Sequence, residues 1–313
     1  MAPLFIHVGY PKTATTTLQV HLFPNHPEID YLGKFVPGFH YTDPVLGRHV
    51  GAMITEGKAL YDGGADARRD FEEVRAASKK KAVVLSSESF VHVTAPDVCM
   101  VADRVKSVCA PCKIIITIRE QRSFLESFYR THGRFGQYLF LVKDEFEDIS
   151  FPIHIDRWLS IMARSQERNV LSLIHFDRIV GYYDALFGRD NVLVLLYDEL
   201  MVAPEDFIRK LCAFLSIDSG TALDLVRGRC ENPGSPSRLV LCGDKAPVYL
   251  SPVMEVTEAE PGQTTARWIS TLRDEDACMA NDWRVLLGKL YRDGNQRLQS
   301  VRGLPLAEFG YSC

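Results

Sequence analysis

The sequence has no hydrophobic run that is long enough to cross a membrane. Its longest uninterrupted aliphatic runs, Ile114–Ile116 and Val192–Leu196, have the length of strands, whereas a membrane-spanning helix needs about 20 apolar residues. The N-terminus also lacks a basic segment followed by a long apolar one, and Gly9, Pro11 and Lys12 come too early for a signal peptide. We therefore expect a cytoplasmic protein that is intact from Met1.

An excess of charge of one sign is also missing. The 36 Lys and Arg residues nearly balance the 40 Asp and Glu residues, which gives a formal net charge of −4. This balance argues against a generally basic protein that binds nucleic acid or a membrane surface, but a local basic pocket is still compatible with it. Apolar residues make up 46% and charged residues 24% of the 313 residues, as in ordinary globular proteins. The length allows one large α/β domain or two small domains.

The eight cysteines do not form the pattern of a disulfide-rich protein, because they are spread along a chain without an export signal. Only Cys109 and Cys112 have the spacing of a redox pair or of half a zinc site. This pair follows a helical stretch, whereas a redox dithiol needs a helix N-terminus, which lowers the thiol pKa. No second pair of this spacing is present to complete a zinc site. We predict two ordinary, partly buried thiols.

Strand and helix patterns alternate along the chain. We expect strands over Leu4–Val8, Ile29–Gly33, Ala82–Leu85, Lys113–Ile118 and Val192–Tyr197. We expect helices over Thr15–Phe23, Asp66–Lys80, from a cap at Asp97 to Val108, Gln121–Arg134, His154–Arg164, Arg178–Phe187, Pro204–Leu215 and Asp274–Gln299. This alternation predicts a single α/β domain over residues 1–313, with a central parallel sheet that is flanked by helices.

The range 218–263 departs from this alternation, because it is dense in Gly, Pro and Ser and has few periodic signals. Such a long irregular stretch in a compact domain usually covers a site. We predict that it is a loop-rich lid.

The first predicted strand runs directly into Gly9–Thr17 and then into a helix. Free backbone N–H groups and the positive end of the helix dipole make this arrangement a cradle for phosphate, and Lys12 adds a charge. Only two residues separate Gly9 from Lys12, so the spacing differs from that of a nucleoside triphosphatase loop. The segment predicts binding of one terminal phosphate or phosphosulfate group; the alternative interpretation is a Thr-rich helix cap.

Residues 10–16, with the sequence YPKTATT, resemble the 5′-phosphosulfate loop (Y-P-K-[ST]-G-[ST]-[ST]) of sulfotransferases that use 3′-phosphoadenylyl sulfate (PAPS). The resemblance implies the P-loop NTPase-like sulfotransferase fold. It also implies that the cofactor is bound by Pro11, Lys12, Thr13, Ala14, Thr15, Thr16 and Thr17. Ala14 stands where the family has Gly; it is tolerated at negative φ and costs about 1 kcal/mol or more at positive φ.

A second motif agrees with this resemblance. The family's 3′-phosphate motif is an Arg at the end of the next buried strand and a Ser eight residues later, and Arg119 and Ser127 have this spacing. An Arg at the carboxyl end of a parallel strand points into the ligand crevice, and its planar fork suits a phosphate. The alternative is an Arg that pairs with a carboxylate and a Ser on the helix surface. Arg122 and Arg130 have no motif support, and we interpret them as solvated or steering charges.

The remaining resemblance is looser. Residues 196–200 (LYDEL) resemble the segment after the next strand in the family, where Tyr197 is expected to pack, and residues 295–298 and 309–311 resemble the ends of bacterial members. The Arg-Lys-Gly loop that cytosolic sulfotransferases place over the 3′-phosphate is absent. The candidates for an equivalent role are Asn232, Ser235 and Arg238.

Sulfuryl transfer needs positioning and charge stabilisation more than covalent help. Lys12 is the candidate for stabilising the leaving 5′-phosphate, and the resemblance implies that Ser127 holds Lys12 until an acceptor binds. We expect PAPS as donor, 3′-phosphoadenosine 5′-phosphate (PAP) as product, and no metal. Glu88 is the candidate base; alternatively it caps a helix or pairs with an Arg. His92 is the reserve base.

The other histidines carry less information. His7 lies on the first strand and is expected to be a satisfied core residue, and nothing in the sequence places His132.

The sequence predicts a PAPS-dependent sulfotransferase that acts on a hydroxyl or amine of a small-molecule, glycan or lipid acceptor, with no nucleic acid partner. The alternatives are a P-loop kinase or nucleotide hydrolase using ATP and Mg²⁺, and a non-catalytic nucleotide-binding domain. The acceptor and the oligomeric state are not readable from the sequence. Six aromatic residues have two interpretations: they line an apolar or sugar-stacking acceptor pocket, or they belong to the core. These residues are Phe35, Phe39, Tyr41, Phe135, Tyr138 and Phe140.

Overall fold

A central sheet organises the computed structural model. The residues that the structure describes are 1–36, 39–41, 44–57, 59–91, 97–133, 153–164, 169–229, 238–241, 248–250, 267–268 and 278–313. The sheet has six strands in the order β3-β2-β4-β1-β5-β6. Its parallel strands are β1 (Leu4–His7), β2 (Ile29–Val36), β4 (Ala82–Ser86), β5 (Cys112–Ile118) and β6 (Val192–Leu196), and β3 (Phe39–Tyr41) is an antiparallel edge strand. The predicted parallel sheet is confirmed.

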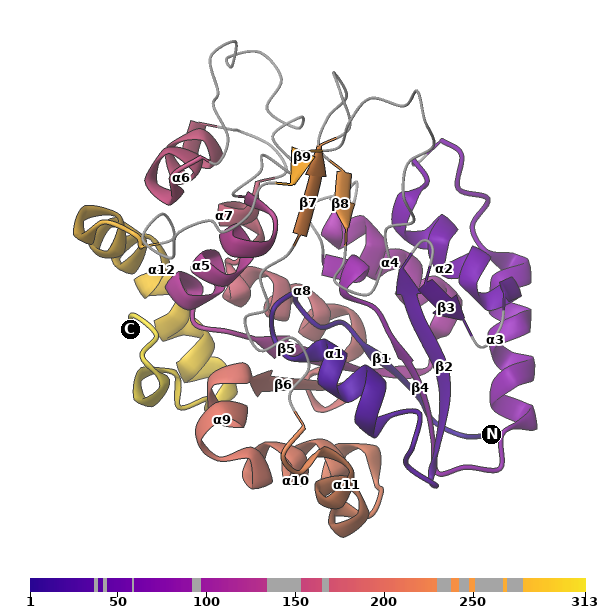
Figure 1. The fold of residues 1–313 in the computed structure, drawn as a ribbon. Helices are drawn as coiled ribbons and strands as arrows, with labels where there is room; N and C mark the ends of the chain where they lie inside the picture. Colours follow the sequence, from indigo (N-terminus) through magenta and orange to yellow (C-terminus); the bar gives the residue numbers. More distant parts are fainter. Residues whose placement is uncertain are drawn as a thin grey trace.

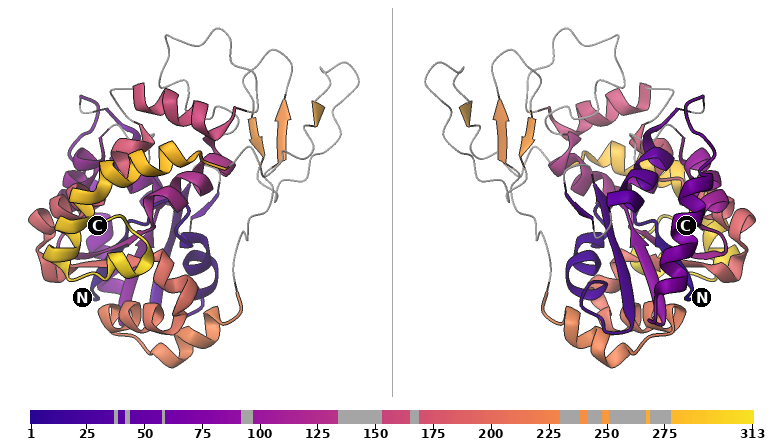
Figure 2. Two further views of the ribbon diagram at one scale, coloured as in Figure 1. Left: turned by 90° about the vertical axis from the view of Figure 1, so that its left-hand side faces the viewer. Right: turned by 90° about the vertical axis from the view of Figure 1, so that its right-hand side faces the viewer.

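The central strands are buried on both faces, because successive side chains of a strand point to opposite sides. Ile114 and Ile116 of β5 belong to one hydrophobic core, whereas Ile115 between them belongs to the other. Every residue of β1 and β4 is buried. Helices therefore cover both faces of the sheet, as the two views in Figure 2 show.

The helices divide between the two cores. The core that contains Ile114 also includes residues of α2 (Pro44–Thr55), α3 (Ala65–Ala77), α4 (Val98–Cys109), α5 (Gln121–Thr131), α6 (Ile155–Arg164), α7 (Val170–Leu173), α8 (Phe176–Phe187) and α12 (Asn281–Arg302). The core that contains Ile115 includes residues of η1 (Leu18–Leu22), α10 (Pro204–Leu215) and α11 (Ser219–Val226). Figure 1 shows α10 and α11 together, below the sheet in that view.

Several predicted helix boundaries are close to those observed. Asp97 caps α4 as predicted, because its carboxylate accepts hydrogen bonds from the amides of Cys99 and Met100. The predicted helix over residues 15–23 consists of a short α1 (Thr15–Thr17) followed by the π-helical segment η1. The α5 helix ends at Thr131, three residues earlier than predicted.

The prediction of a loop is wrong for the first part of the range 218–263, because residues 219–226 form the helix α11. Asp218 caps this helix by accepting a hydrogen bond from the amide of Thr221 at 2.6 Å. Ala222 is buried in the core beside α10 and η1. Farther along, β8 (Val248–Leu250), β7 (Arg238–Leu241) and β9 (Arg267–Trp268) form a small antiparallel sheet. The other residues of the range, 230–237, 242–247 and 251–263, lie outside the described residues.

A buried polar network lies at the carboxyl ends of the central strands. The His7 ring nitrogens lie 2.8 Å from Ser86 Oγ (Nδ1) and 3.3 Å from Thr117 Oγ1 (Nε2). Gln19 Nε2 donates to the same Ser86 hydroxyl at 2.8 Å. His7, Ser86 and Thr117 have no exposed surface. His7 is therefore the satisfied core histidine that was predicted, and it links β1, β4 and β5 beneath the loop that follows β1.

That loop has an unusual backbone. Lys12 has φ of 66° and Ala14 has φ of 59°, both in the left-handed region. The loop is held from within by the Thr13 hydroxyl, which donates to the Tyr10 carbonyl at 2.6 Å. Gly9 makes the turn possible, because a Cβ there would lie 2.2 Å from the methyl group of Thr15. Left-handed residues in a turn direct successive amides into one concavity, which is the form of an anion-binding nest.

The conformation of Ala14 generates a stability prediction. A left-handed L-residue costs about 1–2 kcal/mol, and the extra freedom of glycine in the unfolded chain costs about 0.4–1 kcal/mol. We therefore expect Ala14→Gly to raise the free energy of unfolding by about 0.5–1 kcal/mol, measured by urea denaturation. The matched control is Ala76→Gly, at an exposed position in the last turn of α3, which should lower it by up to about 1 kcal/mol. A loss at both positions would contradict the left-handed assignment.

Candidate active site

The predicted site residues follow strands that end at the same edge of the sheet. The loop with Lys12 follows β1, Glu88 follows β4 and Arg119 follows β5. The register pairs His7 with Ser86 and with Ile115, and Ile118 with Leu196. The carboxyl ends of these strands therefore meet, and this edge is where open parallel sheets bind ligands. Figure 1 shows α1, which continues from the loop, in front of these strands.

The two predicted cofactor motifs are in direct contact. Arg119 Nη1 donates a hydrogen bond to the Lys12 carbonyl at 3.0 Å, although 107 positions separate the two residues. The carbonyl belongs to one of the left-handed residues of the loop. Arg119 therefore holds the backbone of the loop that follows β1 in place.

Two further groups hold the Arg119 side chain. Its Nε donates to Ser123 Oγ at 2.8 Å, and its guanidinium carbon lies 4.4 Å from the centre of the Tyr197 ring. A charged plane over an aromatic ring is an attractive arrangement. The orientation of the guanidinium is thus set by the loop, by the first turn of α5 and by the residue that follows β6.

Ser123, which the sequence analysis did not single out, contacts Arg119. Ser127 is half-buried one helical turn farther along α5, and its carbonyl accepts a hydrogen bond from the Thr131 hydroxyl at 3.0 Å. Residues four positions apart lie on the same helix face, so Ser123 and Ser127 follow one another along one line. This i, i+4 repeat of serine is visible in the sequence and could have pointed to Ser123.

Lys12 carries a charge in an unfavourable environment. Burial lowers the pKa of its ammonium group; the Glu88 carboxylate raises that pKa, and the positive charge of Arg119 lowers it. Lys12, Ala14 and Thr16 are half-buried, whereas Thr13, Thr15 and Thr17 are buried. An anion beside Lys12 would stabilise its charged form, because an opposite charge within a few ångströms opposes the effect of desolvation.

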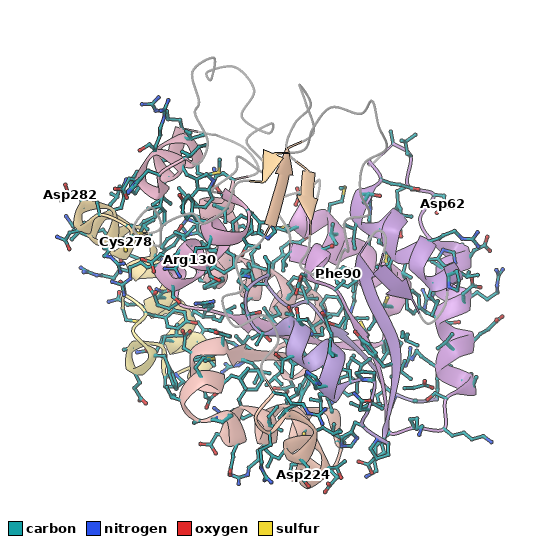
Figure 3. All side chains as sticks on the ribbon, in the orientation of Figure 1. Asp62, Phe90, Arg130, Asp224, Cys278 and Asp282 are labelled. Carbon is teal, nitrogen blue, oxygen red and sulfur yellow. The ribbon has the colours of Figure 1, made fainter. Side chains whose placement is uncertain are left out.

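Glu88 belongs to this constellation. It is the first residue of the short 3-10 helix η2 (Glu88–Val91), and its Oε1 accepts a hydrogen bond from the Thr15 hydroxyl. The contact connects the segment after β4 with the loop after β1. Two residues farther on, Phe90 has no exposed surface and is labelled well inside the molecule in Figure 3. The buried Phe90 anchors η2 beside the loop.

Arg122 is not the solvated or steering charge that was predicted. Its Nε donates to Glu120 Oε1 at 2.8 Å and its Nη2 donates to the Gly310 carbonyl at 2.8 Å. The sequence could not show this partner, because 188 positions separate Arg122 from Gly310. Arg130 is exposed near the end of α5. His132 caps the same helix, with its ring 4.7 Å from that of Phe128.

Other predicted residues are not placed by the structure. His92, Asn232, Ser235, Phe135, Tyr138 and Phe140 lie outside the described residues, and Arg238 is described only through the backbone of β7. Phe35, Phe39 and Tyr41 are likewise described only through the backbones of β2 and β3.

Cys109 and Cys112 are buried free thiols. Burial raises the pKa of the Cys109 thiol well above its usual value and that of Cys112 to about 12. Reactive cysteines have a lowered thiol pKa, so the prediction of ordinary thiols is confirmed.

Two features are absent from the described parts of the chain. No group of three or more His, Cys, Asp and Glu side chains in these parts is arranged to hold a metal ion. Among the same residues, no helix combines the length and the apolar character needed to cross a bilayer.

No protein-family model matches the sequence, and no curated protein matches it. Solved structures do match. The sulfotransferase of Alicyclobacillus acidocaldarius is 18% identical, and the match covers 99% of each chain with a TM-score of 0.53. A sulfotransferase domain of a Synechococcus olefin synthase is 17% identical over 73% of this chain and 78% of its own, with a TM-score of 0.44. A mouse sulfotransferase complexed with PAP is 17% identical over 74% of this chain and 68% of its own, with a TM-score of 0.37.

The first of these matches extends over 99% of both chains, and at 18% identity it is a likeness of fold. This fold is the one that the resemblance of the loop and of the Arg119 motif implied. The chain has the α/β fold of a sulfotransferase.

Proposed function

We propose that the protein is a sulfotransferase that moves the sulfuryl group of PAPS to a hydroxyl or amine acceptor. The observation that carries this proposal is the hydrogen bond between Arg119 and the Lys12 carbonyl. It brings a candidate 5′-phosphosulfate loop and a candidate 3′-phosphate motif to one edge of the sheet. A nucleotide that is phosphorylated at both its 3′ and 5′ positions needs two such neighbouring anion sites.

The residues present fit such a nucleotide. The left-handed backbone at Lys12 and Ala14 favours an anion at the loop, and the half-buried ammonium group of Lys12 gains from one. The planar guanidinium of Arg119 is already oriented by Ser123 and Tyr197, which suits the recognition of a phosphate monoester. When bound, PAPS would supply the sulfuryl group and a bisphosphate leaving group. In this proposal, Ser127 contacts the 3′-phosphate or holds Lys12.

In this proposal Lys12 stabilises charge, Glu88 takes a proton, and Thr15 positions Glu88. Lys12 stabilises the negative charge that develops on the oxygen between the sulfur and the 5′-phosphate, because a fixed charge in a partly buried site acts strongly there. Glu88 accepts the proton of the acceptor hydroxyl or amine. The Thr15 hydroxyl, which donates to Glu88, belongs to the loop that would bind the phosphosulfate. Thr15 therefore holds the base next to the reacting group.

The first prediction concerns nucleotide choice. PAP at 100 times its dissociation constant should stabilise the fold by about 2.7 kcal/mol, which raises the melting temperature by several degrees. ADP lacks the 3′-phosphate and should have a much smaller effect. The measurement is a thermal-shift titration with PAP, ADP and ATP with Mg²⁺, and with an Arg119→Leu variant that should lose the preference for PAP. Stabilisation by ATP with Mg²⁺ alone would replace the proposal with a kinase or nucleotide hydrolase.

The second prediction concerns Lys12. Lys12→Ala should lower kcat, because the activation free energy rises by about 2.7–4 kcal/mol. Its effect on the dissociation constant of PAP should be much smaller. The reason is that the charge on the bridging oxygen is absent from PAPS and develops as the S–O bond breaks, whereas the affinity for PAP is shared with the other phosphate-binding groups of the proposed site. Transfer of label from radiolabelled PAPS to alcohols and amines gives kcat, and calorimetry gives PAP affinity. The control is Lys79→Ala, an exposed lysine after α3. Equal losses of turnover and affinity would make Lys12 a simple phosphate anchor.

The third prediction concerns Glu88. Glu88→Gln keeps an oxygen that accepts from Thr15 but cannot take a proton at neutral pH, so kcat should fall by a factor of about 10²–10⁴ while PAP affinity persists. Glu72→Gln, in an exposed pair with Arg68 on α3, is the matched control. If Glu88→Gln retains full turnover, the base is another residue, and His92 is tested next. If the unchanged protein binds PAP but transfers no sulfuryl group, the protein is a non-catalytic nucleotide-binding domain.

A further inference from the structure

Asp198 connects three segments that are far apart in the sequence. Its Oδ2 accepts hydrogen bonds from the Glu120 amide at 2.9 Å and from the Tyr311 hydroxyl at 3.0 Å. Asp198 belongs to α9 (Tyr197–Val202), directly after β6, and Glu120 directly follows Arg119. Tyr311 is 3% exposed, so its hydroxyl group is held inside the protein. One carboxylate oxygen therefore joins the residue after Arg119 to the C-terminal segment.

The residues next to Glu120 contact the same C-terminal segment. Arg122 Nη2 donates to the Gly310 carbonyl at 2.8 Å. Gln121 Nε2 donates to Asn295 Oδ1 at 2.7 Å, and Asn295 Nδ2 donates to the Ser312 carbonyl at 2.9 Å. Gln121 and Asn295 are each 2% exposed. Residues 120, 121 and 122 are thus each linked to the segment 310–312, directly or through one side chain.

These contacts converge on the start of α5, where Arg119 is oriented. Glu120 is the N-cap of α5, and its Oε2 accepts a hydrogen bond from the Ser123 amide at 2.9 Å. The hydroxyl of the same Ser123 accepts from Arg119 Nε at 2.8 Å. A displacement of Glu120 would therefore move both the backbone that carries Arg119 and the serine that orients its guanidinium.

We propose that Tyr311 and Asp198 are positioning residues for the recognition of the 3′-phosphate through Arg119. This inference rests on the proposed function, because it assumes that Arg119 binds that phosphate. The pair Tyr311–Asp198, which we call the C-terminal clasp, fixes the Glu120 amide and so fixes Arg119 before the nucleotide arrives. An oriented guanidinium loses less conformational entropy on binding than a mobile one. Neither clasp residue needs to touch the nucleotide for this effect.

The test separates the 3′-phosphate from the rest of the nucleotide. Tyr311→Phe removes only the hydroxyl, and Asp198→Asn keeps the size of the side chain but removes the negative charge that strengthens both hydrogen bonds. Each should raise the dissociation constant of PAP about tenfold, the effect of losing one hydrogen bond to a charged group, and raise that of 5′-AMP by a much smaller factor, because 5′-AMP lacks the phosphate that Arg119 would bind. Calorimetry with PAP and with 5′-AMP measures this, at a temperature where circular dichroism shows each variant to be folded.

The matched control is Tyr291→Phe. Tyr291 is 2% exposed and its hydroxyl donates to the Leu171 carbonyl at 2.9 Å, so the variant also loses one buried hydrogen bond, but the partner lies on α7 and not at the start of α5. It should lower the melting temperature and keep the preference for PAP over 5′-AMP. If Tyr311→Phe does not fold, Asp198→Asn carries the test.

The outcomes separate the inference from the proposed function. A selective loss of PAP affinity in the clasp variants supports the inference. Equal losses for PAP and 5′-AMP, or a clasp variant that keeps the preference for PAP, would overturn it while the 3′-phosphate site stands. If the unchanged protein binds PAP no more tightly than 5′-AMP, the 3′-phosphate site itself is refuted and the inference falls with it.

Discussion

The arrangement of the site depends on the guanidinium of Arg119. Its contacts with the Lys12 carbonyl, the Ser123 hydroxyl and the Tyr197 ring reach the segments that follow β1, β5 and β6. A planar group with donors in fixed directions can satisfy such partners together, which a flexible ammonium group does less well. Because parallel strands end at one edge, these segments meet only there, and Arg119 is the residue that connects them. The loop, the start of α5 and the segment after β6 therefore form one unit.

The loop after β1 contains backbone conformations and a buried charge that are energetically unfavourable. Lys12 and Ala14 hold left-handed backbone conformations, and burial lowers the pKa of the Lys12 ammonium group. Strain of this kind persists only where the surrounding structure enforces it. Here the enforcing contacts are the Thr13 hydroxyl on the Tyr10 carbonyl, the buried Tyr10 ring and the hydrogen bond from Arg119. A bound anion would be stabilised by the concavity and by the charge that this conformation presents.

Much of the fold follows from local patterns in the sequence. The β-branched run at residues 113–118 predicts a strand that is buried on both faces, and β5 is such a strand. Asp97 predicts the start of α4, and the placing of His7 on a buried strand predicts a satisfied core histidine. The prediction was wrong at residues 219–226, because α11 is short and places a single residue, Ala222, among the fully buried ones. A helix with so small a buried face leaves only a weak periodic signal.

The sequence by itself determined the strand–loop–helix segment around Lys12 and the spacing of Arg119 from Ser127, because both are local properties of the chain. It also determined that the chain alternates strands and helices, which fixes a parallel sheet. Only the tertiary structure decided which side chains meet at its edge. The pairing of Thr15 with Glu88 spans 73 positions, and those of Asp198 with Glu120 and Tyr311 span 78 and 113. Such contacts depend on the order β2-β4-β1-β5-β6, which is set by how the crossover helices pack and not by any local pattern.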